Sequence, residues 1–484
     1  MRHAGSGPDL RPCSVEVASG KVGRVRTVVV VGGGIAGLSA ARFLAEQGDD
    51  VVVLEGSPET GGKLRRAEVG GVLVDVGAEA MLNRRPEGVD LAQALGLAIE
   101  HPAVASSRIW TRGALRPLPR SLMGVPLDEV QLRASGVLSE DGLERALAEV
   151  GLPPSEMASD VAREVADDVS VGDLVDQRFG PEVTDRLVEP LLGGVYAGHA
   201  REISARAAVP QLVTLASQGS VLAQSAQVAT TYDLPVFAGL PGGMGGLTDA
   251  LAAPLDVRRD ATVRELARTA SGFALTVGPA SAPELLEADA VVLATPAAPA
   301  ARLLQGLAPV AAAELAGIES ASMAVVTFAF RAADVTGLDD SSGFLVPPVD
   351  GRAIKASTFS FVKWDWVRRA GAAAGLVHLR TSLGRHREEA VLQRSDEELV
   401  ALSLAELAEA VGLTARPVDV HVQRWGGGLP QYAVGHLDRV ARIRAAVAEV
   451  AGLAVCGAAY DGVGIPAVIA SSRRAVADLG APVR

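Results

Sequence analysis

The feature that most constrains this chain of 484 residues is a glycine fingerprint set between two strand-like runs. Val25 to Val31 (VRTVVVV) is rich in β-branched residues, which is typical of a buried parallel strand. Gly32, Gly34 and Gly37 then fit the pattern G-x-G-x-x-G and open the helix-like run IAGLSAARFLAEQG. Asp50 to Glu55 (DVVVLE) is a second buried strand. This strand-turn-helix-strand unit predicts a dinucleotide-binding α/β domain.

Each residue of the fingerprint has a separate role in holding a pyrophosphate. Gly32 permits the tight turn, Gly34 lets the backbone approach the phosphates, and Gly37 lets helix and strand pack closely. The helix N-terminus offers free N–H groups and a partial positive charge. Glu55 follows about 20 residues further on, where an acidic side chain accepts hydrogen bonds from ribose hydroxyls. The alternative, that Glu55 merely ends a strand, explains less of this pattern.

A second glycine element favours FAD over NAD as the dinucleotide that this domain binds. Gly61-Gly62-Lys63 comes six residues after Glu55 (EGSPETGGK) and precedes the run GGVLVDVGAEA. It resembles the GG motif of flavin amine oxidases, phytoene desaturases and porphyrinogen oxidases, which NAD-only domains lack. Near the C-terminus, the turn Gly462 to Ile465 opens another helix. The resemblance to these flavoproteins implies that the N-terminus of this helix lies at the flavin, where it would stabilise negative charge. A strict NAD dehydrogenase is therefore disfavoured, although either turn alone could be an ordinary loop.

A chain of 484 residues exceeds what one hydrophobic core usually supports, so we expect an α/β protein of two or three domains. Helical spacing extends from about Leu127 to Gln227, whereas Ala288 to Pro296, Val377 to Ser382 and Leu453 to Gly457 are strand-like. Because strand-turn-helix units stand at both ends, we expect a Rossmann-like FAD-binding domain built from distant segments, with a mixed-sheet substrate domain and a helical insertion. The expected parts are a disordered leader at 1–24, the FAD-binding domain at 25–100, 235–300 and 440–484, a largely helical insertion at 101–234, and the substrate-binding domain at 301–439.

Charge and composition exclude several classes of function. A net charge of −12 argues against a nucleic-acid partner, which usually requires a basic face. The two cysteines, Cys13 and Cys456, are too few and too far apart for a disulfide framework or a zinc site, so we expect no metal and a reducing cytoplasm. The longest uncharged stretch, Ala207 to Tyr232, is interrupted by four Gln, so we expect no transmembrane segment. Peripheral membrane contact stays open.

Five longer motifs lie along the middle and later part of the chain. They are VEPLLGGVYAGHAREIS (Val188 to Ser204), PVFAGLPGGMGGLTDAL (Pro235 to Leu251), GFLVPP (Gly343 to Pro348), KASTFSFVKW (Lys355 to Trp364) and RWGGGLPQYAVGHL (Arg424 to Leu437). These motifs resemble those of the porphyrinogen oxidases, a family of flavoproteins, and the resemblance covers nearly the whole chain. Within that family, the run GVLVDVGAEAMLNRRPE and the high Gly and Ala content resemble the actinobacterial branch, whose members are similar to coproporphyrinogen III oxidases.

This resemblance implies a six-electron oxidation of coproporphyrinogen III to coproporphyrin III in haem biosynthesis. Three hydride equivalents would pass to the flavin, and O2 would reoxidise it each time with release of H2O2. The protein would mainly hold a ring-methylene carbon over the flavin in a dry site, so we name no catalytic base. The downstream ferrochelatase is a candidate partner. Protoporphyrinogen IX oxidase, a flavin amine oxidase and a flavin-binding scaffold without turnover are the alternatives.

The resemblance also assigns FAD contacts by position. Val263 would pair its backbone with the adenine, while Trp425 and the turn Val463, Gly464 and Ile465 would lie against the flavin. We expect non-covalent binding, because Cys456 ends an apolar strand rather than lying in the glycine turn where monoamine oxidases tether flavin. The remaining expected contacts are Gly32, Gly33, Gly34, Ile35, Ala36, Gly37, Glu55, Gly56, Lys63, Gly77, Ala78, Glu79 and Ala80.

Coproporphyrinogen carries four propionates, so its pocket should present cations or amide donors. Arg84 and Arg85 follow the GAEAML turn, but Leu82 stands where eukaryotic relatives carry an arginine that faces a substrate carboxylate. Lys355 and Arg380 are the other candidates. For each of these cations, a solvated surface position is an equally good interpretation.

Overall fold

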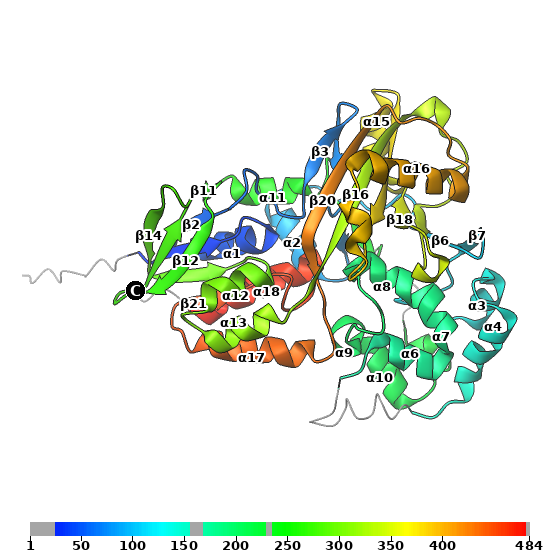
Figure 1. Cartoon of the computed structure of the whole chain (residues 1–484), viewed down its shortest axis with the longest axis horizontal. Coiled ribbons are helices and arrows are strands. Elements are labelled where there is room, and N and C mark those ends of the chain that lie inside the picture. The colour runs from blue at the N-terminus through cyan, green and yellow to red at the C-terminus, as the bar shows by residue number, and fades with distance from the viewer. Residues whose placement is uncertain (1–24, 155–167, 229–234, 481–484) are drawn as a thin grey trace, which may run out of the picture.

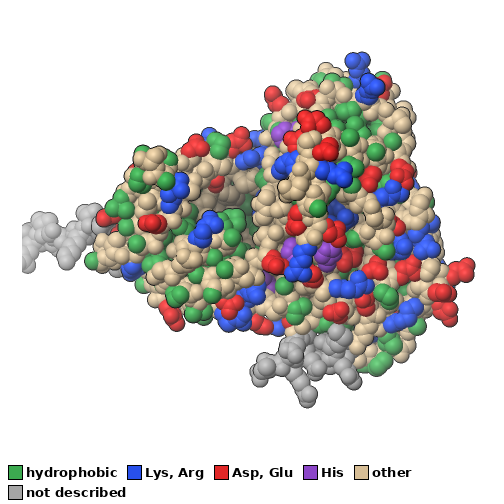
Figure 2. Space-filling view, viewed as in Figure 1, with side chains coloured by type: hydrophobic (Ala, Val, Ile, Leu, Met, Phe, Trp, Pro, Cys, Tyr) green, Lys and Arg blue, Asp and Glu red, His purple; other side chains and the backbone are tan. Residues whose placement is uncertain are grey.

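The computed structural model describes residues 25–154, 168–228 and 235–480. The leader predicted at 1–24, with Cys13, lies outside these residues, as do short pieces of the predicted helical insertion. Figure 1 shows a parallel sheet with its helices on the left, a mixed sheet at the upper right and a helical layer at the lower right. Figure 2 shows acidic and basic side chains interspersed over the face turned to the viewer.

The parallel sheet has five strands that come from distant stretches of the chain, in the order β11, β2, β1, β15, β21. This confirms that strands from both ends of the chain meet in one nucleotide-binding sheet. The strands are β1 (Thr27–Val31), β2 (Asp50–Leu54), β11 (Asp256–Arg258), β15 (Ala290–Leu293) and β21 (Leu453–Val455).

Both faces of the parallel sheet are buried, which explains why its strands are runs of Val and Leu. Val28 and Val30 pack toward α1 (Ile35–Glu46), α11 (Gly245–Ala252) and α18 (Ile465–Leu479). Val29 and Val31 point the opposite way, toward a three-stranded antiparallel sheet and three more helices. These elements are β12 (Val263–Arg268), β13 (Phe273–Val277), β14 (Glu284–Ala288), α12 (Ala297–Leu304), α13 (Pro309–Ala316) and α17 (His436–Ala448).

The mixed sheet has seven strands, and its neighbours are antiparallel except for the parallel pair β17 and β6. It confirms the expected α/β class with a mixed sheet. Two of its strands, β6 and β7, come from the segment assigned to the helical insertion, so that segment also contributes an edge to this sheet. The strands in order are β20 (Asp419–Pro430), β16 (Ser320–Arg331), β19 (Leu376–Leu383), β18 (Ile354–Thr358), β17 (Gly343–Leu345), β6 (Arg108–Thr111) and β7 (Ala114–Pro117).

The two faces of the mixed sheet have different roles. Val326 and Phe328 belong to a buried cluster with residues of α15 (Asp365–Ala372) and α16 (Asp396–Val411). On β16, the neighbours that alternate with them include Met323, whose register partner on β20 is Trp425. Since side chains alternate along a strand, Met323 and Trp425 lie on the face away from α16.

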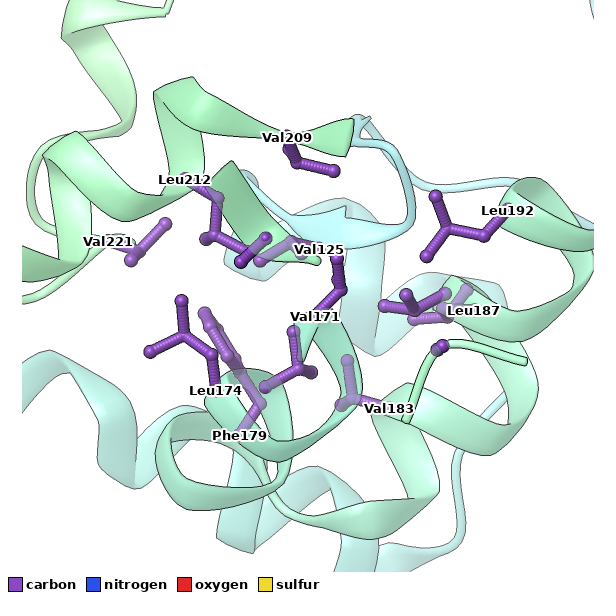
Figure 3. Close-up of a cluster of buried hydrophobic side chains, with 14 of the residues drawn as sticks. Val125, Val171, Leu174, Phe179, Val183, Leu187, Leu192, Val209, Leu212 and Val221 are labelled. Atoms are coloured by element: carbon purple, nitrogen blue, oxygen red, sulfur yellow. The ribbon is translucent and has the colours of Figure 1, made fainter. Parts of the chain in front are cut away.

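The helical layer has its own apolar core, in which side chains from several short helices point toward one another (Figure 3). Leu174, Phe179 and Leu212 are fully or almost fully buried there. Ser170 caps α6 by accepting a hydrogen bond from the backbone N–H of Asp173 at 2.9 Å, a standard start signal for a helix. The helices are α3 (Glu129–Ser135), α4 (Glu140–Leu147), α6 (Val171–Phe179), α7 (Pro181–Val183), α8 (Glu189–Tyr196), α9 (Ala205–Ala208) and α10 (Pro210–Gln218). The exact domain boundaries stay a prediction.

Candidate FAD and substrate site

The fingerprint glycines lie at the carboxyl edge of the parallel sheet, where β1 turns into α1. Gly32 has φ +113°, and a Cβ there would lie 2.8 Å from the carbonyl oxygen of Ala294. A Cβ on Gly37 would lie 1.8 Å from the carbonyl oxygen of Gly32, so α1 packs directly on the turn. Gly34 has open space beside it, with Gly62 Cα nearest at 3.8 Å. The loop thus leaves room for a pyrophosphate against bare backbone at the start of a helix.

Glu55 extends from the end of β2 to the same loop. Its carboxylate accepts hydrogen bonds from the backbone N–H of Gly33 at 2.7 Å and of Ser57 at 2.8 Å. A carboxylate has about four acceptor sites, so the group can also accept from ribose hydroxyls. The carbonyl of Glu55 accepts from Ala261 N–H at 2.8 Å, which brings the start of β12, with Val263, beside Gly56. The structure therefore gathers the predicted adenosine contacts at one place.

The double glycine lies directly against the fingerprint. Gly61 donates its N–H to the carbonyl of Gly33 at 2.8 Å and forms an isolated bridge with Gly34. Gly61 and Gly62 both have positive φ, +100° and +58°, which favours glycine at both positions. Lys63 follows, and burial lowers the pKa of its ammonium. Elements that the sequence separates by almost thirty residues form one cradle.

At the other end of this cradle, the loop of Gly77, Ala78, Glu79 and Ala80, between β4 (Val72–Asp75) and β5 (Met81–Leu82), contacts both Lys63 and residues of the mixed sheet. Ala78 donates its N–H to the carbonyl of Lys63 at 3.0 Å. A Cβ on Gly77 would lie 2.0 Å from that same carbonyl and 3.1 Å from Cζ2 of Trp425. Lys63, Gly77 and Trp425, three predicted FAD contacts, therefore meet.

Glu79 is the centre of a buried ion-pair network. Its carboxylate pairs with Lys363 at 2.7 Å and with Arg380 at 3.1 Å, and Arg380 also donates to the carbonyl of Gly77 at 2.7 Å. Burial alone would raise the pKa of Glu79, but the charges of Arg380 and Lys363 lower it to about 2. Lys363 was not predicted from the sequence, although it lies in the motif KASTFSFVKW. Arg380, predicted to face the substrate, is engaged in holding this loop.

The C-terminal turn completes the site from the opposite end of the chain. Gly464, in extended conformation, is the N-cap of α18, and Ile465 begins the helix. Ser472 of α18 donates its hydroxyl to the carbonyl of Ala36 at 2.8 Å, so α18 lies beside α1. Cys456 is fully buried beneath them, and burial raises the pKa of its thiol to about 12. Val463 precedes the cap and packs against the core of the helical layer.

The four predicted substrate cations have different environments. Arg84 is exposed, and Arg85, the N-cap of α2 (Pro86–Ala94), pairs with Glu87 at 2.6 Å. Lys355 is buried on β18, with its Nζ 4.0 Å from Sδ of Met323. Arg380 is held by Glu79, as described above. The structure thus brings Lys355 and Arg380 to the mixed sheet and leaves the two arginines of the 84–85 loop at the surface.

The described residues contain no cluster of three or more His, Cys, Asp or Glu side chains arranged to hold a metal ion. In the same described ranges, no helix is long and apolar enough to cross a membrane.

Comparison with known proteins places this architecture in a family. Residues 35–480 match the model of the flavin containing amine oxidoreductases. Coproporphyrinogen III oxidase of Mycobacterium tuberculosis is 37% identical over 466 residues, which cover 93% of this chain and 96% of that protein. Coproporphyrinogen III oxidase of Bacillus subtilis is 28% identical over 93% of this chain and 97% of its own length.

The crystal structure of a putative protoporphyrinogen oxidase from Exiguobacterium sp. 255-15 superimposes with a TM-score of 0.82. It shares 29% sequence identity and covers 94% of this chain and 98% of its own. The sequence relatives, the fold and the glycine-lined cradle all point to a flavin-dependent oxidase. The chain therefore belongs to the flavin-containing amine oxidoreductases, and within them to the porphyrinogen oxidase group of FAD-dependent enzymes.

Proposed function

We propose that this protein oxidises coproporphyrinogen III to coproporphyrin III, with O2 as the electron acceptor and H2O2 as the second product. The reaction would serve haem biosynthesis in the cytoplasm. The observation that carries this proposal is the 37% identity to a coproporphyrinogen III oxidase over 93% of the chain. The contact of Lys63 and Gly77 with Trp425 of the mixed sheet supports the proposal. It would place the flavin next to the sheet that is predicted to bind the substrate.

The residues of the site fit FAD along its length. Glu55 and Val263 would hold the adenosine, the glycines of the two loops the pyrophosphate, and Lys63 and Trp425 the flavin. When bound, FAD supplies the acceptor for the hydride equivalents that the macrocycle gives up and passes their electrons to O2. We propose non-covalent binding, because the thiol of Cys456 is enclosed in the core.

The protein itself would act by positioning and by electrostatics. The free N–H groups and dipole of α18 at Gly464 would stabilise negative charge on the reduced flavin. The side of the mixed sheet that carries Met323 and Trp425 would hold the macrocycle over the flavin and exclude water. Aromatisation of the macrocycle drives the reaction, so we assign no proton acceptor.

An amine oxidase is a weaker alternative. Amine substrates need an aromatic cage, since cations are held over aromatic ring faces. In the described ranges, the Tyr and Trp side chains other than Trp425 are buried in the cores. Tyr196 and Tyr432, for example, pack against one another in the helical layer with ring centroids 5.5 Å apart. They are not available to line a second wall of such a cage.

The test compares coproporphyrinogen III, protoporphyrinogen IX and an aliphatic amine with purified protein. Anaerobic mixing should bleach the flavin absorbance with coproporphyrinogen III, and aerobic turnover should release about three H2O2 per porphyrin, as three hydride transfers require. We expect kcat/KM for coproporphyrinogen III to exceed that for protoporphyrinogen IX by about tenfold or more, equivalent to ~1.4 kcal/mol. The opposite preference would establish the protoporphyrinogen IX alternative. No bleaching with any substrate would indicate a scaffold without turnover.

A further inference from the structure

Two cations, Lys355 on β18 and Arg385 just after β19, are buried together at the junction of the mixed sheet and the helical layer. Their relative exposures are only 4% and 6%. The guanidinium of Arg385 donates to the carbonyl of Val346 at 3.1 Å, and Val346 donates its N–H to the carbonyl of Lys355 at 2.9 Å. One backbone residue therefore links the two cations.

Neither cation has a counterion among the described residues. Within those ranges no carboxylate lies in ion-pair distance of Lys355 or Arg385, and the Lys355 ammonium lies 4.0 Å from the thioether sulfur of Met323. The carboxylates of Glu388, Glu189 and Glu406 act on the charge of Arg385 only from beyond ion-pair distance. Glu189 accepts instead from the backbone N–H of Ala200 at 2.9 Å. Glu406 accepts from the backbone N–H groups of Ala353 and Ile354, both at 2.8 Å.

This arrangement differs from the neighbouring network on the same sheet, where Lys363 and Arg380 both pair with the carboxylate of Glu79. A buried charge without a partner costs several kcal/mol, on the order of a whole domain's net stability. Two cations buried near one another without an ion-pair partner are the arrangement expected of an anion site. Burial, and then the charge of Arg385, lower the pKa of Lys355 to about 7.

The position of the pair connects it to the flavin. Met323, next to the Lys355 ammonium, is the register partner of Trp425, which was predicted to lie against the flavin and which meets the predicted FAD contacts Lys63 and Gly77. On the other side, His386, the residue after Arg385, donates its N–H to the carbonyl of Ala197 at 2.7 Å. Ala197 ends α8 of the helical layer. The pair therefore lies where a ring held over the flavin would reach the helical layer.

We propose that Lys355 and Arg385 jointly bind one propionate carboxylate of the porphyrinogen and so fix its orientation over the flavin. The inference rests on the function proposed above. A carboxylate matches both groups, because the guanidinium presents a planar fork of N–H donors and the ammonium a point charge. Its negative charge would relieve the repulsion between the two cations. Arg380, held by Glu79, would stabilise the loop rather than bind substrate.

The experiment uses the FAD-loaded protein with Lys355→Met and Arg385→Met, and with Lys355→Arg as the conservative variant. Arg331→Met is the matched control, because Arg331 is exposed at the end of β16. The probes are coproporphyrin III and its tetramethyl ester, which keeps the ring and removes the charges. Dissociation constants come from fluorescence titration, and kcat and KM from turnover of coproporphyrinogen III.

We expect both Met variants to weaken binding of coproporphyrin III by about tenfold or more, as the loss of a charge-assisted hydrogen bond implies. Binding of the ester should change little, and the flavin spectrum and FAD content should stay those of the wild type. Lys355→Arg should restore most of the affinity, and Arg331→Met should have no effect. Folding should survive Lys355→Met, since that change removes an unpaired buried charge.

Three outcomes with the variants would overturn the inference. Unchanged affinity of both Met variants for the tetra-acid would show that the pair does not contact a propionate. An equal loss for acid and ester would show that the effect is one of shape. A loss of kcat with KM and affinity unchanged would assign Lys355 to proton transfer instead. Wild-type protein that neither binds nor oxidises the porphyrinogen would overturn the proposed function and this inference together, whereas active wild type with unaffected variants would overturn this inference alone.

Discussion

The backbone N–H of Gly33 donates to Oε2 of Glu55 at 2.7 Å, so the fingerprint loop and the acid at the end of β2 are in direct contact. A Cβ on Gly33 would lie 2.9 Å from the Cβ of Glu55. The glycine is therefore required for the approach of the acid, and the acid orients the loop. This contact ties the adenosine end of the predicted FAD site to its pyrophosphate end.

Glu55→Gln should weaken FAD binding about tenfold or more. The amide keeps the size of the side chain, but it loses the charge that makes hydrogen bonds to N–H groups and ribose hydroxyls strong. Titration of the flavin-free protein with FAD would measure the effect. Glu68→Gln, at an exposed position on β3 (Arg66–Val69), is the control and should bind FAD like the wild type. Equal affinity in both variants would show that Glu55 does not hold the ribose.

Glu79→Gln should destabilise the protein by up to about 3–5 kcal/mol, because it leaves the half-buried Lys363 and Arg380 without their shared counterion. Urea unfolding of the FAD-loaded protein measures this change. Glu409→Gln removes the partner of Arg352 in an exposed pair and should cost no more than about 1 kcal/mol. Similar costs for the two variants would mean that the Glu79 network contributes no more than a surface pair.

Acid should also weaken the Glu79 network in a defined range. The pKa of Glu79 in the folded protein is lowered to about 2, below the ordinary value of 4.5. Its contribution to stability is therefore present above about pH 4.5 and lost as the pH falls toward 2, because the unfolded chain takes up the proton first. The difference in unfolding free energy between wild type and Glu79→Gln should shrink over that range. A difference that does not depend on pH would contradict the assigned pKa.

The FAD cradle could be predicted from the sequence because its chemistry is local. Gly32, Gly34 and Gly37 act within one turn, and their spacing is a direct consequence of the strand-to-helix geometry. The double glycine was also visible as a motif. Its contact with Gly33, however, depends on how the chain folds back after β2.

The substrate side could not be predicted in the same way. Arg380 and Lys355 are both cations in strand-like runs. Their spacing in the sequence does not indicate that Arg380 pairs with Glu79 whereas Lys355 is buried without an ion pair. Arg385 carried no sequence signal. Whether Arg385 lies near Lys355 depends on the register between β18 and β19, which shifts between Ile354 and Ala356. The absence of an ion-pair partner depends on which side chains pack together in the fold, so it could not be predicted from the sequence.

Cys456 should be inert and the flavin should not be covalently attached. The thiol is fully buried, and burial raises its pKa to about 12, so little thiolate exists at neutral pH. Acid precipitation of the holoenzyme should therefore release all of the FAD into the supernatant. A thiol reagent should label Cys456 only after unfolding, which peptide mapping would show. Flavin that remains in the protein pellet would contradict this prediction.

Lys355→Met should stabilise the porphyrin-free holoenzyme. The ammonium is buried beside Arg385 without a counterion, so its removal relieves both desolvation and repulsion. The pKa of Lys355 is about 7 in the folded protein and about 10.5 when the chain is unfolded. Between these values the unfolded chain binds more protons, so the stability of the wild type rises with pH, while Lys355→Met lacks this gain.

The advantage of Lys355→Met should therefore be largest below about pH 7 and shrink as the pH approaches about 10. Thermal unfolding of both proteins across this range would measure it. Added coproporphyrin III should reverse the order at neutral pH, because only the wild type gains the carboxylate contact and binding to the folded state raises its Tm. A stability advantage that stays constant with pH would show that the charge of Lys355 does not destabilise the folded protein. An advantage that remains after addition of the porphyrin would show that Lys355 does not bind a carboxylate. If Lys355 and Arg385 bind a carboxylate, the pair should destabilise the ligand-free protein and stabilise the protein once the porphyrin is bound.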